Sequence, residues 1–130
     1  MEREPMEELT TSEALLMKCI WTIGGDVPLA DLGAEVEKRF GKKWKRTTIR
    51  TFLTHMEAKQ FIQIYQVGRN SFIKVLIKED CYREEQVQKM KEMWFDGSMS
   101  KFVSAMYQGN PMSEEDRNAI RKLLDNAKED

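Results

Sequence analysis

The sequence predicts a mainly α-helical fold with one small β-hairpin, because three patterns follow one another along the chain. Over residues 10–59, apolar side chains recur at helical spacing. Two runs rich in β-branched and aromatic residues then flank a tight turn at Gly68. Beyond Lys78 the pattern is helical throughout. This order predicts a winged helix-turn-helix domain over residues 1–78, followed by a helical tail over residues 79–130.

The first two helices are predicted from their ends. Thr10 and Glu13 fit a capping box, in which each side chain bonds the backbone N–H of the other, so a helix should follow over residues 10–23. Pro28 suits the first turn of a helix, where its missing donor costs nothing. A second helix is therefore expected from about Pro28 to Gly41.

The third helix, expected over residues 46–59, has two different faces when its residues are placed at about 100° intervals. One face is apolar and carries Ile49, Phe52, Leu53 and Met56. The opposite face carries Thr47, Arg50, Thr51 and Thr54. Threonine is a weaker helix former than Glu or Lys, so three threonines on an exposed face indicate that the face has a function.

Two strands are expected after this helix, over residues 61–67 and 71–77, joined by the turn that contains Gly68. Gln60 stands between the helix and the first strand, where a left-handed glycine is usual. We therefore expect local backbone strain of about 1 kcal/mol at Gln60.

The tail should form three short helices, over residues 79–95 and 98–108 and from Ser113 onward, with Ser98 and Ser113 as N-caps. Three short helices cannot readily close a core alone, so their apolar stripes should meet either the first domain or a second copy of the chain, and a two-fold partner is the simpler arrangement. The expected dimer interface comprises Tyr82, Met90, Trp94, Met99, Phe102, Val103, Met106, Ile120, Leu123 and Leu124.

Charge is distributed unevenly. Residues 1–78 carry 13 basic and 10 acidic side chains, a net charge of +3, whereas residues 79–130 carry 8 and 12, a net charge of −4. From Lys38 to Met56 there are seven Lys or Arg residues and no Asp or Glu. A basic helix followed by a hairpin is typical of a double-stranded DNA reader, so a phosphate-bearing partner should meet this segment.

Individual contacts follow from side-chain chemistry. Arginine can bond guanine bidentately and threonine can contact thymine, so the expected base contacts are Arg46, Thr47, Arg50 and Thr51. The expected phosphate contacts are Lys42, Lys43, Lys45, Thr54 and His55. In the wing, Arg69 and Asn70 should meet the minor groove or a phosphate.

Several classes of function find no support in the sequence. The two cysteines, Cys19 and Cys81, are isolated, and His55 is the only histidine, so we expect no metal site, no cofactor and no enzyme activity. The acidic start of the chain does not resemble a signal peptide, and no apolar run approaches the length of a membrane span. A soluble, cytoplasmic protein is expected.

The chain also resembles a known family. The segments that carry the resemblance are LTTSEALLMKCIW, VPLADLGAEVEK, KWKRTTIRTFLTHMEAK and VGRNSFIKVLI, within residues 9–108. They are similar to the penicillinase-repressor family of bacterial winged-helix transcriptional regulators. The resemblance implies a homodimeric repressor of palindromic operators ahead of antibiotic-resistance genes.

In the β-lactam branch, the resemblance implies that a protease linked to a membrane sensor cuts the tail before a Phe. Phe102 lies in the corresponding segment, preceded by Lys101 where the family usually has Asn. Copper-responsive members carry a cysteine-rich C-terminal motif, which this chain lacks beyond Cys81. Two alternatives remain: a winged-helix regulator released by a small-molecule inducer, and a winged helix used for protein contacts.

Overall fold

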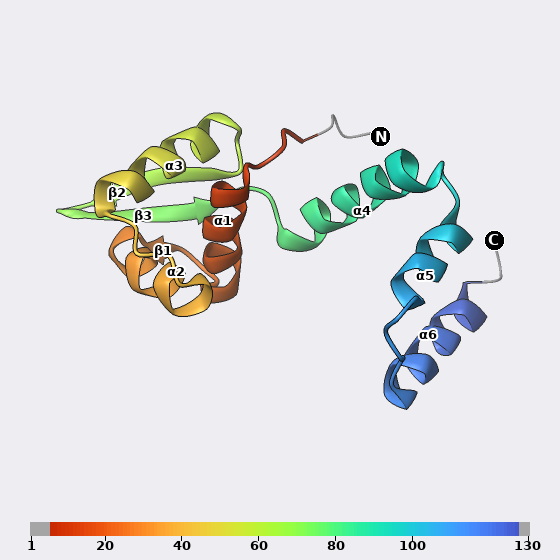
Figure 1. The fold of residues 1–130 in the computed structure, drawn as a ribbon. Helices are drawn as coiled ribbons and strands as arrows, with labels where there is room; N and C mark the ends of the chain where they lie inside the picture. The colour runs from red at the N-terminus through yellow and green to blue at the C-terminus, as the bar shows by residue number, and fades with distance from the viewer. Residues whose placement is uncertain (1–5, 128–130) are drawn as a thin grey trace. The chain divides into compact units, whose positions relative to one another are not determined.

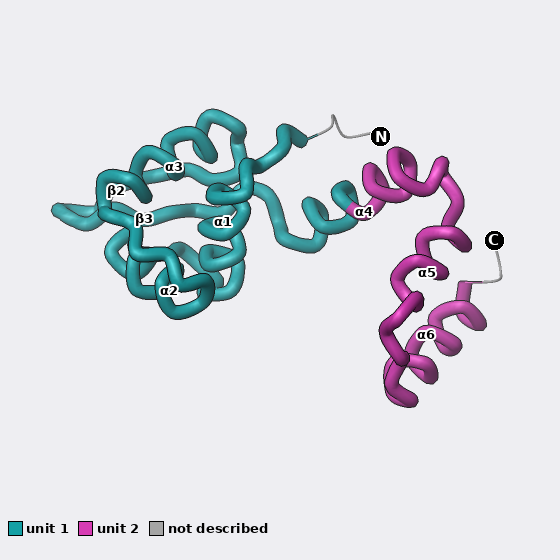
Figure 2. The backbone as a smooth tube through the Cα atoms, in the orientation of Figure 1, with its two compact units in different colours: residues 1–86 teal, residues 87–130 magenta. Residues whose placement is uncertain are grey.

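The computed structural model describes residues 6–127. The chain divides into two compact units, residues 1–86 and 87–130 (Figure 2). The division falls within helix α4, Glu79–Phe95, so the first unit includes the start of that helix as well as the predicted winged-helix domain.

The first unit is a winged helix, which confirms the predicted fold class (Figure 1). Its sheet has the strand order β1-β3-β2, and both strand pairs are antiparallel. The elements in chain order are α1 (Thr11–Ile23), β1 (Val27–Pro28), a 3-10 helix (Leu29–Asp31), α2 (Leu32–Phe40), α3 (Arg46–Ala58), β2 (Ile62–Val67) and β3 (Asn70–Val75).

The second helix begins later than predicted. Pro28 lies in strand β1 with extended backbone angles, φ −64° and ψ 131°, and α2 begins only at Leu32. Val27 and Pro28 pair with Ile73 and Phe72 of β3, so the predicted hairpin is part of a three-stranded sheet. Proline lacks a backbone donor and is tolerated on an edge strand such as β1. This pairing places Pro28 outside the helix that it was expected to start.

The helices pack their apolar faces on one another and on the sheet. In α3 the predicted apolar face is confirmed, since Ile49, Leu53 and Met56 are buried and Phe52 is half-buried. Within residues 6–127, the buried apolar core lies in the first unit and consists of Leu16, Met17, Cys19, Ile20, Val27, Leu29, Leu32, Val36, Ile49, Leu53, Met56, Phe61, Ile62 and Ile73.

Gln60 adopts the predicted left-handed backbone, with φ 67°. The next residue, Phe61, is fully buried, and its N–H donates to the Met56 carbonyl at 3.1 Å. The sharp turn at Gln60 therefore lets the chain leave α3 and place Phe61 in the core. Burial of this ring offsets the strain of the left-handed conformation.

The predicted capping box at the start of α1 is confirmed, and it includes a buried charge. The Thr10 N–H donates to Glu13 Oε1 at 3.0 Å, and the Glu13 N–H donates to Thr10 Oγ1 at 3.2 Å. Lys59, just after α3, donates to the same carboxylate at 2.6 Å. This ion pair joins the start of α1 to the end of α3.

The environment of Glu13 lowers its pKa. Burial raises the pKa. The hydrogen bonds from Lys59 and Thr10 and the charges of Lys59 and His55 together lower it by more than burial raises it, so the net pKa lies below the usual 4.5. A carboxyl group whose pKa is lower in the folded state stabilises the fold at pH values above its unfolded-state pKa. This contribution is lost as the pH falls through the folded-state pKa.

We expect Glu13→Gln to lower the free energy of unfolding at pH 7 by about 1–2 kcal/mol, because Lys59 loses its carboxylate. As the pH falls below 4.5, the free energy of unfolding of the variant should also decrease less than that of the wild type. Thermal unfolding across pH measures both effects, with Glu37→Gln on the exposed surface of α2 as the control. Equal acid sensitivity in the wild type and Glu13→Gln would contradict this account.

The second unit contains the rest of α4 together with α5 (Met99–Tyr107) and α6 (Glu114–Asn126). Ser98 and Ser113 cap α5 and α6 as predicted, each accepting a backbone N–H three residues on. None of the three helices contains a buried residue. Within residues 6–127, no helix is both long and apolar enough to cross a membrane.

Candidate nucleic-acid interface

Helix α3 presents a polar face that the rest of its unit leaves exposed. Arg46, Thr47, Arg50 and Thr51 are all exposed, whereas Ile49, which lies between them in sequence, is buried, as is Leu53 two residues beyond Thr51. The four residues predicted to contact bases therefore share one accessible side of the helix. Helical periodicity brings them together, as predicted.

The threonine hydroxyls on this face bond to their own helix. Thr51 Oγ1 donates to the Thr47 carbonyl at 3.0 Å, and Thr54 Oγ1 donates to the Arg50 carbonyl at 2.9 Å. A hydroxyl whose hydrogen is already used offers only its lone pairs to a base edge. In this conformation Thr51 can accept from a base amino group or pack its methyl against thymine.

The loop before α3 carries the basic residues predicted to meet phosphates. Lys42, Lys43 and Lys45 are exposed. Lys45 is also the N-cap residue of α3, yet its side chain makes no capping bond, and the first turn holds no acidic residue. The first N–H groups of α3 thus lack a side-chain acceptor, and the positive end of the helix dipole adds to the lysine charge.

Within residues 6–127, these cations form no ion pair with an acidic side chain. The ion pairs between described residues involve other cations, among them Lys18, Arg39, His55, Lys59 and Lys91. Lys42, Lys43, Lys45, Arg46 and Arg50 take part in none of them. Such a group attracts an anion without first having to break an internal pair.

Trp44 holds this loop against α3. Its ring lies edge-on to that of Phe52, with the ring centroids 5.0 Å apart. The lysines on either side of Trp44 are therefore attached to the helix through a packed aromatic residue. This contact agrees with the apolar face predicted for α3.

His55 is partly engaged elsewhere. Its side chain is 61% exposed, and Nδ1 lies 3.9 Å from Glu13 Oε2. The structure therefore places His55 near the α1–α3 ion pair as well as on the accessible side of α3. A phosphate contact by His55 would share the ring with Glu13.

The wing approaches α3 through a residue that the sequence analysis missed. Arg69 and Asn70 are exposed at the turn. The next residue, Ser71, is only 7% exposed and accepts from Arg50 Nη1 at 3.5 Å. Gln66 Nε2 also lies 3.5 Å from Ser71 Oγ. Strand alternation in the sequence could have identified Ser71, because it places Ser71 on the same inward face as the buried Ile73.

Comparison with known proteins agrees with this geometry. The family described as penicillinase repressor matches residues 9–126, nearly the whole chain. The chain belongs to the penicillinase repressor family. It is a DNA-binding transcriptional repressor.

One solved structure similar to this repressor concerns the mechanism for regulation of DNA binding of Bordetella bronchiseptica BpsR by 6-hydroxynicotinic acid. The two chains are 15% identical, with a TM-score of 0.46, and the match covers 91% of this chain and 79% of that chain. A search of curated proteins found no match.

The repressor's second unit exposes most of the predicted interface residues. The most exposed of these are Trp94 at 70%, Leu123 at 68% and Leu124 at 64%, and Met90, Met99, Val103, Met106 and Ile120 are exposed as well. Phe102 is half-buried, since its ring stacks on Phe95 with the centroids 5.1 Å apart.

Tyr82 does not belong with this group. It lies in the first unit, where its ring is 5.2 Å from Phe61 and 6.0 Å from Trp21, and its hydroxyl accepts from the Leu9 N–H at 3.2 Å. Its place in an apolar helical stripe suggested a dimer contact. The start of α4 packs on the winged helix instead, so we remove Tyr82 from the proposed interface.

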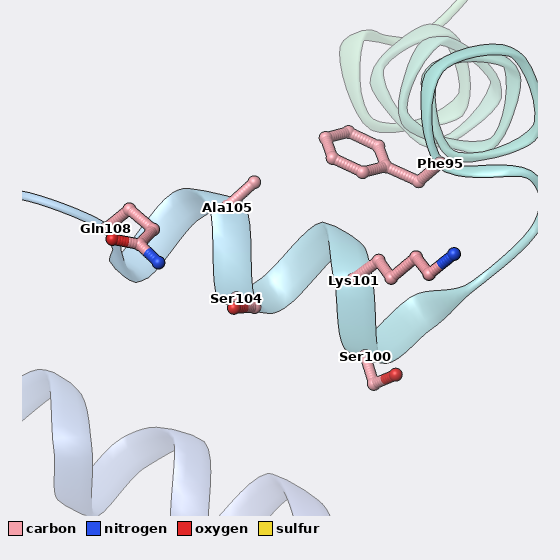
Figure 3. Close-up of a pocket in the computed structure, with 6 residues that line it drawn as sticks. All are labelled: Phe95, Ser100, Lys101, Ser104, Ala105 and Gln108. Atoms are coloured by element: carbon pink, nitrogen blue, oxygen red, sulfur yellow. The ribbon is translucent and has the colours of Figure 1, made fainter.

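A hollow of about 540 Å³ runs along α5 in the second unit (Figure 3). It is lined by Phe95 of α4 and by Ser100, Lys101, Ser104, Ala105 and Gln108 of α5. Small side chains such as those of Ser104 and Ala105 allow another helix to approach closely.

Metal-binding residues are not clustered. Within residues 6–127, no group of three or more His, Cys, Asp or Glu side chains is arranged to hold a metal ion. Cys19 is buried and Cys81 is partly buried, both as free thiols. Burial raises the pKa of the Cys19 thiol, which favours its unreactive protonated form.

Proposed function

We propose that this repressor binds a two-fold symmetric, palindromic DNA operator as a homodimer, with α3 of each copy in the major groove. The observation that carries the proposal is the exposed face of α3, on which Arg50, Thr47 and Thr51 lie together. In a symmetric dimer the two α3 helices would enter grooves about 34 Å apart.

Residues of different chemistry take different parts in this proposal. Arg46, Thr47, Arg50 and Thr51 read base edges. DNA phosphates are contacted by Lys42, Lys43, Lys45, Thr54 and His55. In the wing, Arg69 and Asn70 contact the adjacent DNA backbone or the minor groove. A protein-contact role would not require threonines on the same helix face as an arginine that forms no ion pair within residues 6–127.

Homodimerisation is supported by the second unit. Its helices bury no residue, yet they expose Trp94, Leu123 and Leu124 at 64–70%. Large apolar surfaces of this kind usually mark a protein interface. A second copy offers the same apolar side chains in return, as a two-fold interface requires. The interface would use the predicted set without Tyr82.

The phosphate contacts predict a change in salt dependence. We expect Lys43→Ala to weaken binding to all duplexes about equally and to reduce the slope of log K against log salt by about 0.9. Fluorescence anisotropy at several salt concentrations measures this slope. Lys122→Ala, in α6, serves as the control and should leave the slope unchanged. A change of base preference in Lys43→Ala would contradict the proposed role.

We also propose that proteolysis of the tail relieves repression, at operators that control a resistance operon. The Lys101–Phe102 bond lies in the first half of α5, and the Phe102 ring stacks on Phe95. A sensor-linked protease would therefore need this part of α5 to open. Cutting there would remove α6 and most of α5 from the DNA-binding unit.

The size of the repressor recovered from induced cells tests this proposal. Mass spectrometry of cells exposed to a β-lactam should find a fragment ending at Lys101 in the wild type and intact chain in Phe102→Ala. Intact wild-type chain in cells where the operator is derepressed would favour a small-molecule inducer instead.

A further inference from the structure

We propose that Ser71 of the wing is a specificity-determining positioning residue, which holds the Arg50 guanidinium in the orientation that reads a base. The inference rests on the proposed role of Arg50 in base recognition and extends it to β3. It assigns the wing a part in sequence reading through α3, in addition to its own contacts with DNA.

Ser71 occupies an unusual place for a polar side chain. It belongs to β3 and is directly opposite Gln66 of β2. The same face of the sheet carries the pairs Ile64–Ile73 and Ile62–Val75, so it is apolar at its base and becomes polar only toward the turn. Ser71 is 7% exposed, and its hydroxyl is aimed at the side on which α3 packs.

The hydroxyl oxygen of Ser71 lies within reach of two nitrogen donors. Arg50 Nη1 and Gln66 Nε2 both donate to Ser71 Oγ, each at 3.5 Å. A serine oxygen has two lone pairs, so it can accept from both nitrogens at once. Gln66 restrains the hydroxyl from the neighbouring strand, and the hydroxyl in turn restrains the arginine from the sheet.

A neutral anchor suits an arginine that must still bind DNA. Guanidinium carries five N–H donors, and Ser71 occupies one of them. No ion pair between described residues involves Arg50. A carboxylate in this position would neutralise the charge and compete with guanine, whereas serine orients the side chain and leaves its charge available. The 3.5 Å distance is long for a hydrogen bond, so the guanidinium remains free to adjust.

Preordering of Arg50 should appear as discrimination between sequences. A long arginine side chain loses rotamer freedom when it binds a base, and that loss is smaller if the protein has already restricted it. Without Ser71, Arg50 keeps its charge and its attraction to phosphates but samples more orientations. Ser71→Ala should therefore weaken binding to the preferred operator about 2- to 10-fold and hardly affect a non-specific duplex.

A double-mutant cycle tests the inference on the full chain. Wild type, Arg50→Ala, Ser71→Ala and the double variant are titrated against the duplex that the wild type selects from a random pool. Each is also titrated against that duplex with single base pairs replaced. Gln66→Ala is a second test of the network, and Gln63→Ala, on the outward face of β2, is its matched control.

We expect Ser71→Ala to lose discrimination at the base pair whose recognition Arg50→Ala abolishes, and to have no further effect once Arg50 is absent. Gln66→Ala should show a weaker form of the same loss, with Gln63→Ala unchanged. Thermal stability of Ser71→Ala should stay close to wild type, because Arg50 and Gln66 can bond to water instead.

Other outcomes distinguish failure of the positioning role of Ser71 from failure of the base-reading role of Arg50. Additive effects of Ser71→Ala and Arg50→Ala, or an equal loss of affinity for every duplex, would overturn the positioning role alone and leave Arg50 as a base reader. Unchanged base preference in Arg50→Ala would overturn the proposed role of Arg50 and the inference with it.

Discussion

Replacement of Arg50 by alanine is expected to cost about 5- to 150-fold in affinity for the preferred operator, equivalent to about 1–3 kcal/mol, and to relax base preference. Arg50 is exposed on α3, takes part in none of the ion pairs between described residues and lies beside two exposed threonines. A bidentate contact with guanine explains both expected effects. Anisotropy titrations with the selected duplex and its single-base variants measure them.

Arg83→Ala provides the control for this variant. Arg83 is an exposed arginine in the first part of α4, away from the α3 face in sequence and assigned no DNA contact. The Arg83→Ala substitution changes the net charge by the same amount as Arg50→Ala, so it controls for the loss of long-range electrostatic attraction. If Arg50→Ala and Arg83→Ala lost affinity equally for all duplexes, Arg50 would be a general charge rather than a base reader.

Replacement of Trp94 by alanine is expected to weaken self-association about 30-fold, which corresponds to about 2 kcal/mol. Trp94 is 70% exposed in the second unit. Large aromatic side chains that become buried in an interface contribute a disproportionate share of its free energy. Analytical ultracentrifugation gives the dimer dissociation constant. The affinity of the variant should fall more for the operator with both half-sites than for an isolated half-site.

Leu76→Ala is the matched control for Trp94→Ala. Leu76 is an apolar residue of the first unit, 49% exposed and outside the predicted interface. Its replacement removes exposed apolar surface without touching the tail. A monomeric wild type at micromolar concentration, or equal dimerisation of Trp94→Ala and wild type, would contradict the proposed use of the tail.

Features that depend on neighbouring residues in sequence could be predicted. The capping box of Thr10 and Glu13, the caps at Ser98 and Ser113 and the left-handed Gln60 all arise within a few residues of chain. The two faces of α3 follow from helical periodicity alone. Helical periodicity was also sufficient to predict which side chains lie on the exposed face of α3.

Features that depend on contacts between distant residues could not be predicted in this way. Pro28 is consistent with a helix start, and only its pairing with Phe72 makes it part of a strand. Tyr82 fits the tail stripe, but Phe61 and Trp21 hold it in the first unit.

The Lys59–Glu13 pair and the Arg50–Ser71 contact join residues 46 and 21 positions apart. Helical or strand periodicity does not show which residue pairs with which. Only the fold brings the members of each pair together, although a serine on the inward face of β3 was a hint that a polar partner should be sought.

The most direct test of the central claim is selection of bound duplexes from a random DNA pool by the full-length protein at about physiological salt. A homodimer that reads DNA with α3 should recover a two-fold symmetric site with half-sites about one helical turn apart. Recovery of duplexes with no common sequence would contradict the claim that this face of α3 reads bases.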